Sequence, residues 1–99
     1  MPHELVFSAI ALEEINQADI YYESQSSGLG QKFLEALKES FKKLKENPQY
    51  FGFINEHKII RDLKVDAFPF LIVYQIIANK VYIIRVFNTN RDPHSLKNL

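Results

Sequence analysis

The chain has 99 residues, a formal net charge of zero and hydrophobic side chains at 46% of its positions. A chain of this length has room for one hydrophobic core, so residues 1–99 are expected to form a single domain. Cysteine is absent, which excludes disulfides and thiolate metal sites. The three histidines lack the spacing of metal ligands, so neither a metal nor another cofactor is expected.

The charge is divided unevenly along the chain. Residues 1–47 carry eight acidic side chains and five lysines, whereas residues 48–99 carry four acidic and seven basic side chains. This basic excess is too small for general nucleic-acid binding and favours a protein partner or a small phosphate site. No apolar run is long enough to cross a bilayer, and the N-terminus does not resemble a signal peptide. A cytoplasmic protein without a membrane partner is therefore expected.

The first expected elements are a short strand and a helix. The strand is predicted at His3–Phe7, and Ser8 is suited to cap the helix that follows it. One buried helix face is predicted by apolar residues three and four positions apart, at Ala11, Ile15, Ala18 and Tyr22. The opposite face, which includes Glu14, is expected to meet solvent. The helix is expected to end within Ser24–Gly28.

A second helix is predicted over Gln31–Glu46, after a turn at Gly28–Gly30. Its apolar positions again recur at intervals of three and four, at Phe33, Leu34, Leu37, Phe41 and Leu44. Asn47-Pro48 ends the helix, because the residue before a proline disfavours the helical conformation. Two helices joined by so short a turn are expected to form an antiparallel hairpin.

The second half of the chain has the pattern of strands. After a loop at Gln49–Glu56, alternation over His57–Val65 predicts a strand with one face more buried than the other. Two runs rich in β-branched and aromatic residues, Phe68–Ile77 and Val81–Phe87, flank a short break and predict a β-hairpin. A short helical turn is one possibility for the tail at Pro93–Leu99.

The resulting order is strand, helix, helix, strand, strand, strand. Paired helices that do not alternate with strands indicate an α+β fold (β-α-α-β-β-β), in which a helical hairpin packs on one face of a sheet. The last three strands are expected to form an antiparallel meander, and the N-terminal strand is expected at a sheet edge. The other face of the sheet is expected to be open or thinly covered.

Several segments resemble the RelE/ParE superfamily of bacterial type II toxins, and its ParE-like plasmid-stabilisation branch in particular. The matching segments, in chain order, are Ala18–Tyr22 with Gly30 and Phe33, Leu44 with Asn47 and Pro48, Arg61 through Phe68–Tyr74, Val81–Val86, and Arg91–Pro93. The resemblance covers nearly the whole chain. Its specificity comes from the order and spacing of the segments, since no single one is diagnostic.

The resemblance implies a toxin that is neutralised by a cognate antitoxin. It also implies that the chain forms a homodimer or a toxin–antitoxin hetero-oligomer. ParE-like members are thought to act on DNA gyrase, whereas RelE-like members cleave messenger RNA on the ribosome. Many relatives have a histidine at the end of the last strand, where this chain has Asn88. Asparagine cannot shuttle protons near neutral pH. The sequence therefore favours a toxin that binds its target, with ribosome-dependent mRNA cleavage as the alternative.

Polar residues at the end of the last strand are the main candidates for target binding. Together with two arginines from the sheet they form the set Arg61, Arg85, Asn88, Asn90 and Arg91. A ribonuclease would use Arg61, Arg85 and Arg91 around the scissile phosphate, with Glu56 and His57 as conceivable base and acid. The structural interpretation of Arg85 is a bond to a carboxylate such as Asp92, or to loop carbonyls, that fixes the C-terminal segment.

Aromatic residues are the candidates for contact with the antitoxin. Tyr21 is expected at the margin between the helices and the sheet, and Tyr50, Phe51 and Phe53 form an aromatic loop. The loop has two interpretations of equal weight. It is either an exposed docking patch or a lid over the edge of the core.

Overall fold

We describe residues 2–54, 56 and 58–91 of a computed structural model of the chain. The elements in chain order are β1 (Glu4–Phe7), α1 (Ala9–Gln25), α2 (Leu29–Glu46), the short 3₁₀ helix η1 (Pro48–Tyr50), β2 (Ile60–Lys64), β3 (Phe70–Ile77) and β4 (Lys80–Asn88). The expected order β-α-α-β-β-β and the α+β class are confirmed. No helix in the described part of the chain is long and apolar enough to cross a membrane.

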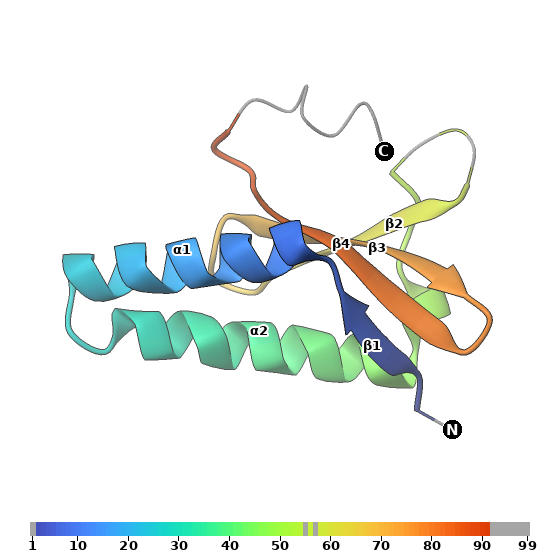
Figure 1. Cartoon of the computed structure of the whole chain (residues 1–99), viewed down its shortest axis with the longest axis horizontal. Helices are drawn as coiled ribbons and strands as arrows, with labels where there is room; N and C mark the ends of the chain where they lie inside the picture. The colour runs from blue at the N-terminus through green and yellow to red at the C-terminus, as the bar shows by residue number, and fades with distance from the viewer. Residues whose placement is uncertain (1, 55, 57, 92–99) are drawn as a thin grey trace.

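The four strands form one sheet in the order β1-β4-β3-β2. The meander β2-β3-β4 is antiparallel, as expected, and β1 lies at the edge beside β4. The pairing of β1 with β4 is parallel, so the sheet is mixed. The chain leaves β1, crosses the sheet through the helical hairpin, and returns through β2 at the far edge (Figure 1).

The main core lies between the two helices and one face of the sheet. Its fully buried members include Phe33 and Leu37 of α2, Ile72 and Tyr74 of β3, and Val81 of β4. Tyr74 also fixes η1, because its hydroxyl donates a 2.6 Å hydrogen bond to the carbonyl of Pro48. Burial raises the pKa of this hydroxyl to about 12, so it stays protonated and able to donate at physiological pH.

The opposite face of the sheet holds a second, smaller apolar cluster. Ile60, Val73 and Phe87 are buried there, with Ile54, Leu71 and Ile84 packed against them. The alternation predicted a strand with one face more buried than the other, but both faces hold buried residues, Leu63 on one and Ile60 on the other. This difference arises because the outer face of the sheet has apolar neighbours on all three meander strands.

Helix α1 begins where the sequence indicates. Ser8 is its N-cap, and the Ser8 hydroxyl oxygen accepts a 2.9 Å hydrogen bond from the amide of Ala11. The same hydroxyl donates a 2.7 Å hydrogen bond to the carbonyl of Ile84 in β4. The cap therefore ties the start of the helix to the sheet as well as satisfying a helix amide.

Helix α2 begins two residues earlier than predicted, at Leu29. The predicted turn Gly28–Gly30 is reduced to Gly28, which has a left-handed conformation with φ of 87°. The carboxylate of Glu23 at the end of α1 accepts hydrogen bonds from the amides of Gly28 and Gly30 at 3.0 and 3.1 Å. An anion from the neighbouring helix thus satisfies the first amides of α2 and lets it start early.

Gly30 of α2 lies close against α1 at this end of the hairpin. A Cβ atom at this position would lie 2.4 Å from Oδ1 of Asp19 and 3.0 Å from the carbonyl oxygen of Asp19. Gly30→Ala is therefore expected to lower the free energy of unfolding by about 1–3 kcal/mol, measured by urea denaturation. The matched control is Gly52→Ala, where a Cβ would meet nothing within 4 Å, so its unfolding midpoint should stay close to that of the parent protein. Equal midpoints for the two variants would contradict this account of the hairpin.

Strand β2 is shorter than predicted, since the ladder begins at Ile60. The chain just before it departs from an extended conformation, with a φ of 55° at Lys58; His57 lies outside the described residues. The preceding loop runs along the outer edge of β2, where the amide of Ile54 donates to the carbonyl of Ile60 at 2.9 Å. The loop thereby covers a strand edge that would otherwise have unpaired backbone groups.

Candidate functional site

The end of β4 carries a turn, Asn88–Arg91, which we call the rim. The amide of Thr89 donates to the carbonyl of Pro69 at 2.8 Å, and the amide of Arg91 donates to the carbonyl of Asn88 at 3.0 Å. The Asn88 side chain accepts a 2.9 Å hydrogen bond from the amide of Asn90. These bonds hold the backbone of the rim, while the side chains of Asn90 and Arg91 are exposed.

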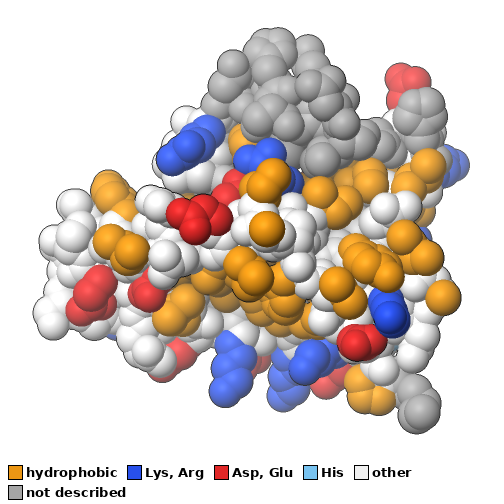
Figure 2. Space-filling view, viewed as in Figure 1, with side chains coloured by type: hydrophobic (Ala, Val, Ile, Leu, Met, Phe, Trp, Pro, Cys, Tyr) orange, Lys and Arg blue, Asp and Glu red, His pale blue; other side chains and the backbone are white. Residues whose placement is uncertain are grey.

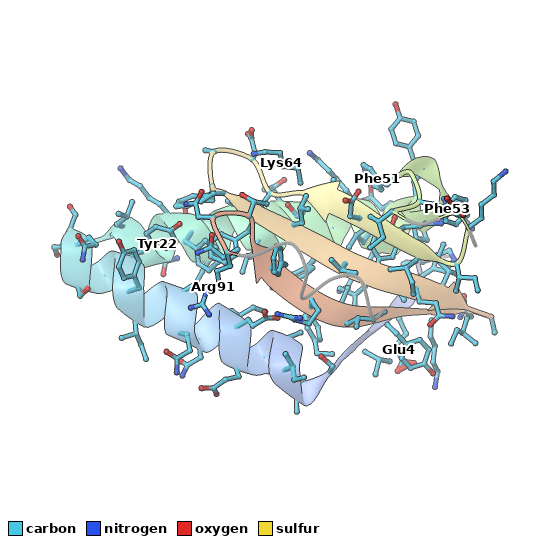
Figure 3. All side chains as sticks on the ribbon, turned by 90° about the horizontal axis from the view of Figure 1, so that it is seen from above. Glu4, Tyr22, Phe51, Phe53, Lys64 and Arg91 are labelled. Atoms are coloured by element: carbon cyan, nitrogen blue, oxygen red, sulfur yellow. The ribbon has the colours of Figure 1, made fainter. Side chains whose placement is uncertain are left out.

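The sequence grouped Asn88 with the target-binding residues. In the structure its side chain is half-buried and its amide oxygen shapes the turn. Asn88 thus supports the rim, whereas the side chains of Asn90 and Arg91 are open to solvent. Seen from above, Arg91 lies near the end of the hairpin where Tyr22 is found, and Phe51 and Phe53 lie at the other end of the sheet (Figure 3).

Arg85 binds a carboxylate, as its structural interpretation required, but the partner is Glu14 of α1. Its Nε and one terminal nitrogen donate to the two Glu14 oxygens at distances of 2.7–3.0 Å. These hydrogen bonds raise the pKa of the Arg85 guanidinium. Asp92, the partner suggested from the sequence, lies outside the described residues. The expectation that Glu14 faces solvent was wrong, since only 21% of its side chain is exposed.

Glu14 escaped detection because its partner is 71 positions away in the chain. Nothing local distinguishes it from the neighbouring Glu13, which is exposed and accepts a hydrogen bond from Gln17. The position of Glu14, three residues after the buried Ala11, is the one signal that could have placed it near the buried face.

Arg61 lies on β2 and points to the loop at the outer edge of the sheet. One of its terminal nitrogens donates to the carbonyls of Gln49 and Phe51 at 3.1 and 2.6 Å. Its guanidinium also stacks over the ring of Phe53, 3.9 Å from the ring centroid. Arg61, a sequence-predicted candidate for target or phosphate binding, therefore stabilises the loop after α2.

The three arginines proposed for phosphate chemistry are not gathered in one place. Arg61 turns toward the outer edge of β2, and Arg85 turns toward α1 beside the opposite meander strand, β4. Since β3 lies between these strands, their backbones are about 10 Å apart. Arg91 lies beyond the end of β4 and is the one arginine of the three with an exposed side chain. Glu56 is exposed, and His57 and His94 lie outside the described residues.

The four aromatic candidates for antitoxin contact differ in exposure. Tyr21 on α1 and Tyr50 on η1 are exposed, with 83% of Tyr50 accessible. Phe53 is 40% exposed beneath Arg61, whereas Phe51 is half-buried and packs against the main core. The aromatic loop is thus both a lid, through Phe51, and an exposed patch, through Tyr50 and Phe53.

Sequence reasoning missed a groove between β1 and α2. We call it the β1–α2 groove, and its volume is about 990 Å³. Its apolar lining consists of Leu5 and Phe7 from β1, Ile15 from α1, and Leu34, Leu37 and Phe41 from α2. Figure 2 shows a hydrophobic band across this side of the molecule. The signal in the sequence was the apolar pair Leu34 and Phe41, which widens the apolar face of α2 beyond the fully buried Phe33, Leu37 and Leu44.

The charged side chains around the groove are mainly basic. Lys38, Lys42 and Lys45 lie along its α2 side, and basic side chains gather below the hydrophobic band in Figure 2. Two glutamates also line the groove, but Glu4 lies 3.8 Å from Lys80. Glu39 is the remaining acidic lining residue, so the lysines outnumber their local counter-charges.

No group of three or more potential metal-ligating side chains occurs among residues 2–54, 56 and 58–91. The rim, the groove and the aromatic loop each have exposed side chains on the described surface.

Comparisons with known proteins identify structures that are similar to this fold. The structure is similar to a chain of the chromosomal ParDE TA system from P. aeruginosa, with a TM-score of 0.72 and 19% identity over 87% of this chain and 95% of that chain. It is also similar to the YoeB dimer from Staphylococcus aureus, with a TM-score of 0.60 and 16% identity, over 87% of this chain and 95% of that chain. No curated protein sequence matches the chain.

A similar α+β fold is therefore found in a chain of that ParDE TA system and in that YoeB dimer. The model of the family described as the ParE toxin of type II toxin-antitoxin system, parDE, matches residues 5–93. The chain belongs to this ParE toxin family.

Proposed function

We propose that this ParE-family toxin arrests growth by binding DNA gyrase through the rim, and that its antitoxin prevents this by occupying the β1–α2 groove. The observation that carries the proposal is the exposed Arg91 on a turn whose backbone is held by hydrogen bonds to Pro69 and Asn88. Arginine on a rigid support is a common centre of binding energy at protein interfaces.

Binding of a target protein explains the arrangement of the arginines and Asn88 better than cleavage of RNA does. Cleavage of RNA without a metal requires a base, an acid and cations around one phosphate. Arg61 and Arg85 are engaged with loop carbonyls and with Glu14, and the Asn88 side chain is used within the turn. The ribosome-dependent ribonuclease remains the alternative against which the target is to be tested.

The antitoxin segment that fits the groove is amphipathic and acidic. Its apolar side chains would replace water against Leu34 and Phe41, and its carboxylates would lie beside Lys38, Lys42 and Lys45. An extended segment could also continue the sheet, since β1 is an edge strand. Tyr50 would extend the contact, because η1 follows directly after α2 at the Lys45 end of the groove.

The role of the rim is tested by expressing Arg91→Ala in a bacterial host and counting the surviving cells after induction. Loss of an arginine at the centre of an interface costs about 2 kcal/mol or more, so the affinity for the target should fall by about 30-fold and growth arrest should be relieved. Lys32→Ala removes an exposed cation from α2 and should leave the arrest intact. Full toxicity of Arg91→Ala at equal protein level would overturn the assignment of the rim.

A further inference from the structure

The edge of β4 that faces away from β3 is paired first with β1 and then, past the end of β1, with side chains at the start of α1. The parallel ladder ends where Phe7 pairs with Ile83. Beyond that point the Ser8 hydroxyl binds the carbonyl of Ile84, and Oε1 of Glu14 accepts a 2.9 Å hydrogen bond from the amide of Val86. Side chains of α1 thus satisfy backbone groups that a further strand residue would otherwise pair.

The β-ladder is irregular at the same place. Val73 pairs with Arg85 and Tyr74 pairs with Ile83, so Ile84 is an extra residue in β4. A bulge of this kind bends a strand and redirects the side chains that follow it. Here the Arg85 side chain reaches Glu14, so one carboxylate binds both the Arg85 guanidinium and the Val86 amide.

The contact between Glu14 and Arg85 is well suited to hold β4 in one position against α1. The two side chains are 20% and 21% exposed, and the guanidinium uses two nitrogens on the two carboxylate oxygens. Bonds of this geometry fix orientation as well as distance, and partial burial reduces screening by salt. Past Val86, β4 is paired on the β3 side, through Phe87 and Asn88, before the rim begins.

We propose that Glu14 and Arg85 are positioning residues, which hold the end of β4 against α1 so that the rim presents Asn90 and Arg91 in one orientation. The proposal rests on the proposed function of the rim as the target-binding surface. It removes Arg85 from the surface that touches the target and assigns Glu14, a helix residue, to the presentation of that surface.

The direct test is amide hydrogen exchange in the full chain carrying Glu14→Ala. Alanine is the best helix former, so α1 itself should be preserved. The amides of Val86 and Arg91 are expected to exchange about tenfold faster, because a charge-assisted acceptor is lost beside the strand end. The amide of Ile72 on β3 should change less than twofold, and Glu13→Ala, at the exposed neighbouring position, should leave all three rates unchanged. Unaltered exchange at Val86 and Arg91 in Glu14→Ala would overturn the proposal.

A second measurement separates this proposal from the function of the rim. The amount of toxin needed to stop growth is compared for Glu14→Ala, Arg91→Ala and the parent protein, with antitoxin affinity measured alongside. Positioning predicts that Glu14→Ala raises this amount about tenfold while antitoxin affinity stays within about twofold, and that Glu14→Asp restores part of the potency. If Arg91→Ala is inactive and Glu14→Ala is fully potent, the positioning role is wrong and the rim assignment stands. If Arg91→Ala is fully potent, the rim assignment itself is wrong.

Discussion

Replacing Leu34 with glutamate is expected to weaken binding of the cognate antitoxin by about 100-fold or more, because the carboxylate would lose its hydration against apolar antitoxin side chains and would repel the acidic antitoxin segment. Leu34 lines the β1–α2 groove, is half-buried and packs against the main core, so urea denaturation of the free variant is used first to show that it remains folded. The measurement is the dissociation constant of the toxin–antitoxin complex, together with the rescue of growth on co-expression.

The matched control for Leu34→Glu is Ile20→Glu, which introduces the same charge at an exposed position of α1 outside the groove. It should leave antitoxin affinity nearly unchanged. Charge reversal at Lys42 adds an electrostatic test, since the loss of affinity in Lys42→Glu should shrink as salt screens the charges. Equal affinities for Leu34→Glu and Ile20→Glu would show that the antitoxin binds elsewhere, and the aromatic loop would then be the next candidate.

Phe33→Ala is expected to produce the largest loss of stability of any substitution considered. Phe33 is fully buried, and its ring lies 5.0–5.3 Å from the rings of Tyr22, Phe68 and Phe70. Removing a buried phenyl ring costs about 3–5 kcal/mol of unfolding free energy, a large part of the total for a domain of this size. Urea denaturation gives the value directly.

The reason for so large an effect is that Phe33 joins three parts of the chain. It belongs to α2, Tyr22 belongs to α1, Phe68 precedes β3, and Phe70 is the first residue of β3. Lys32→Ala, at the neighbouring exposed position, should change the unfolding free energy by less than about 0.5 kcal/mol. A loss below about 1 kcal/mol for Phe33→Ala would mean that this aromatic cluster can collapse around the cavity, and that the core is less rigid than described.

The elements with strong local signals were predictable from the sequence. The Ser8 cap, the periodicities of both helices and the β-branched runs of the hairpin each depend on residues close together in the chain, and the structure confirms all three. The edge position of β1 followed from topology, since a single short strand before a helical hairpin has few places to pair.

The features that escaped prediction depend on contacts between distant parts of the chain. Glu14 binds Arg85, and Glu23 caps α2 across the helical turn. Arg61 was recognised as a cation but its partners, the carbonyls of Gln49 and Phe51, became visible only with the loop in place. Acidic and basic side chains of this kind look like surface residues in a sequence, because their periodicity matches that of the solvent-facing positions.

The rim was singled out from the sequence, whereas the groove was not. Asn90 and Arg91 were identified because polar residues after the last strand stand out against an apolar run. The groove is formed by β1 and α2, which are separated by α1 in the chain, so no single segment of the sequence displays it. Surfaces assembled from several elements therefore require the fold, even where each lining residue is correctly predicted to be apolar.

The most direct test of the proposed function is the activity of purified DNA gyrase in the presence of this protein. We expect supercoiling of relaxed plasmid to be inhibited, the inhibition to be lost with Arg91→Ala, and the antitoxin to reverse it. Translating ribosomes given the same protein should keep their messenger RNA intact. Cleavage of that messenger RNA with supercoiling unaffected would contradict the proposal and identify the protein as a ribonuclease.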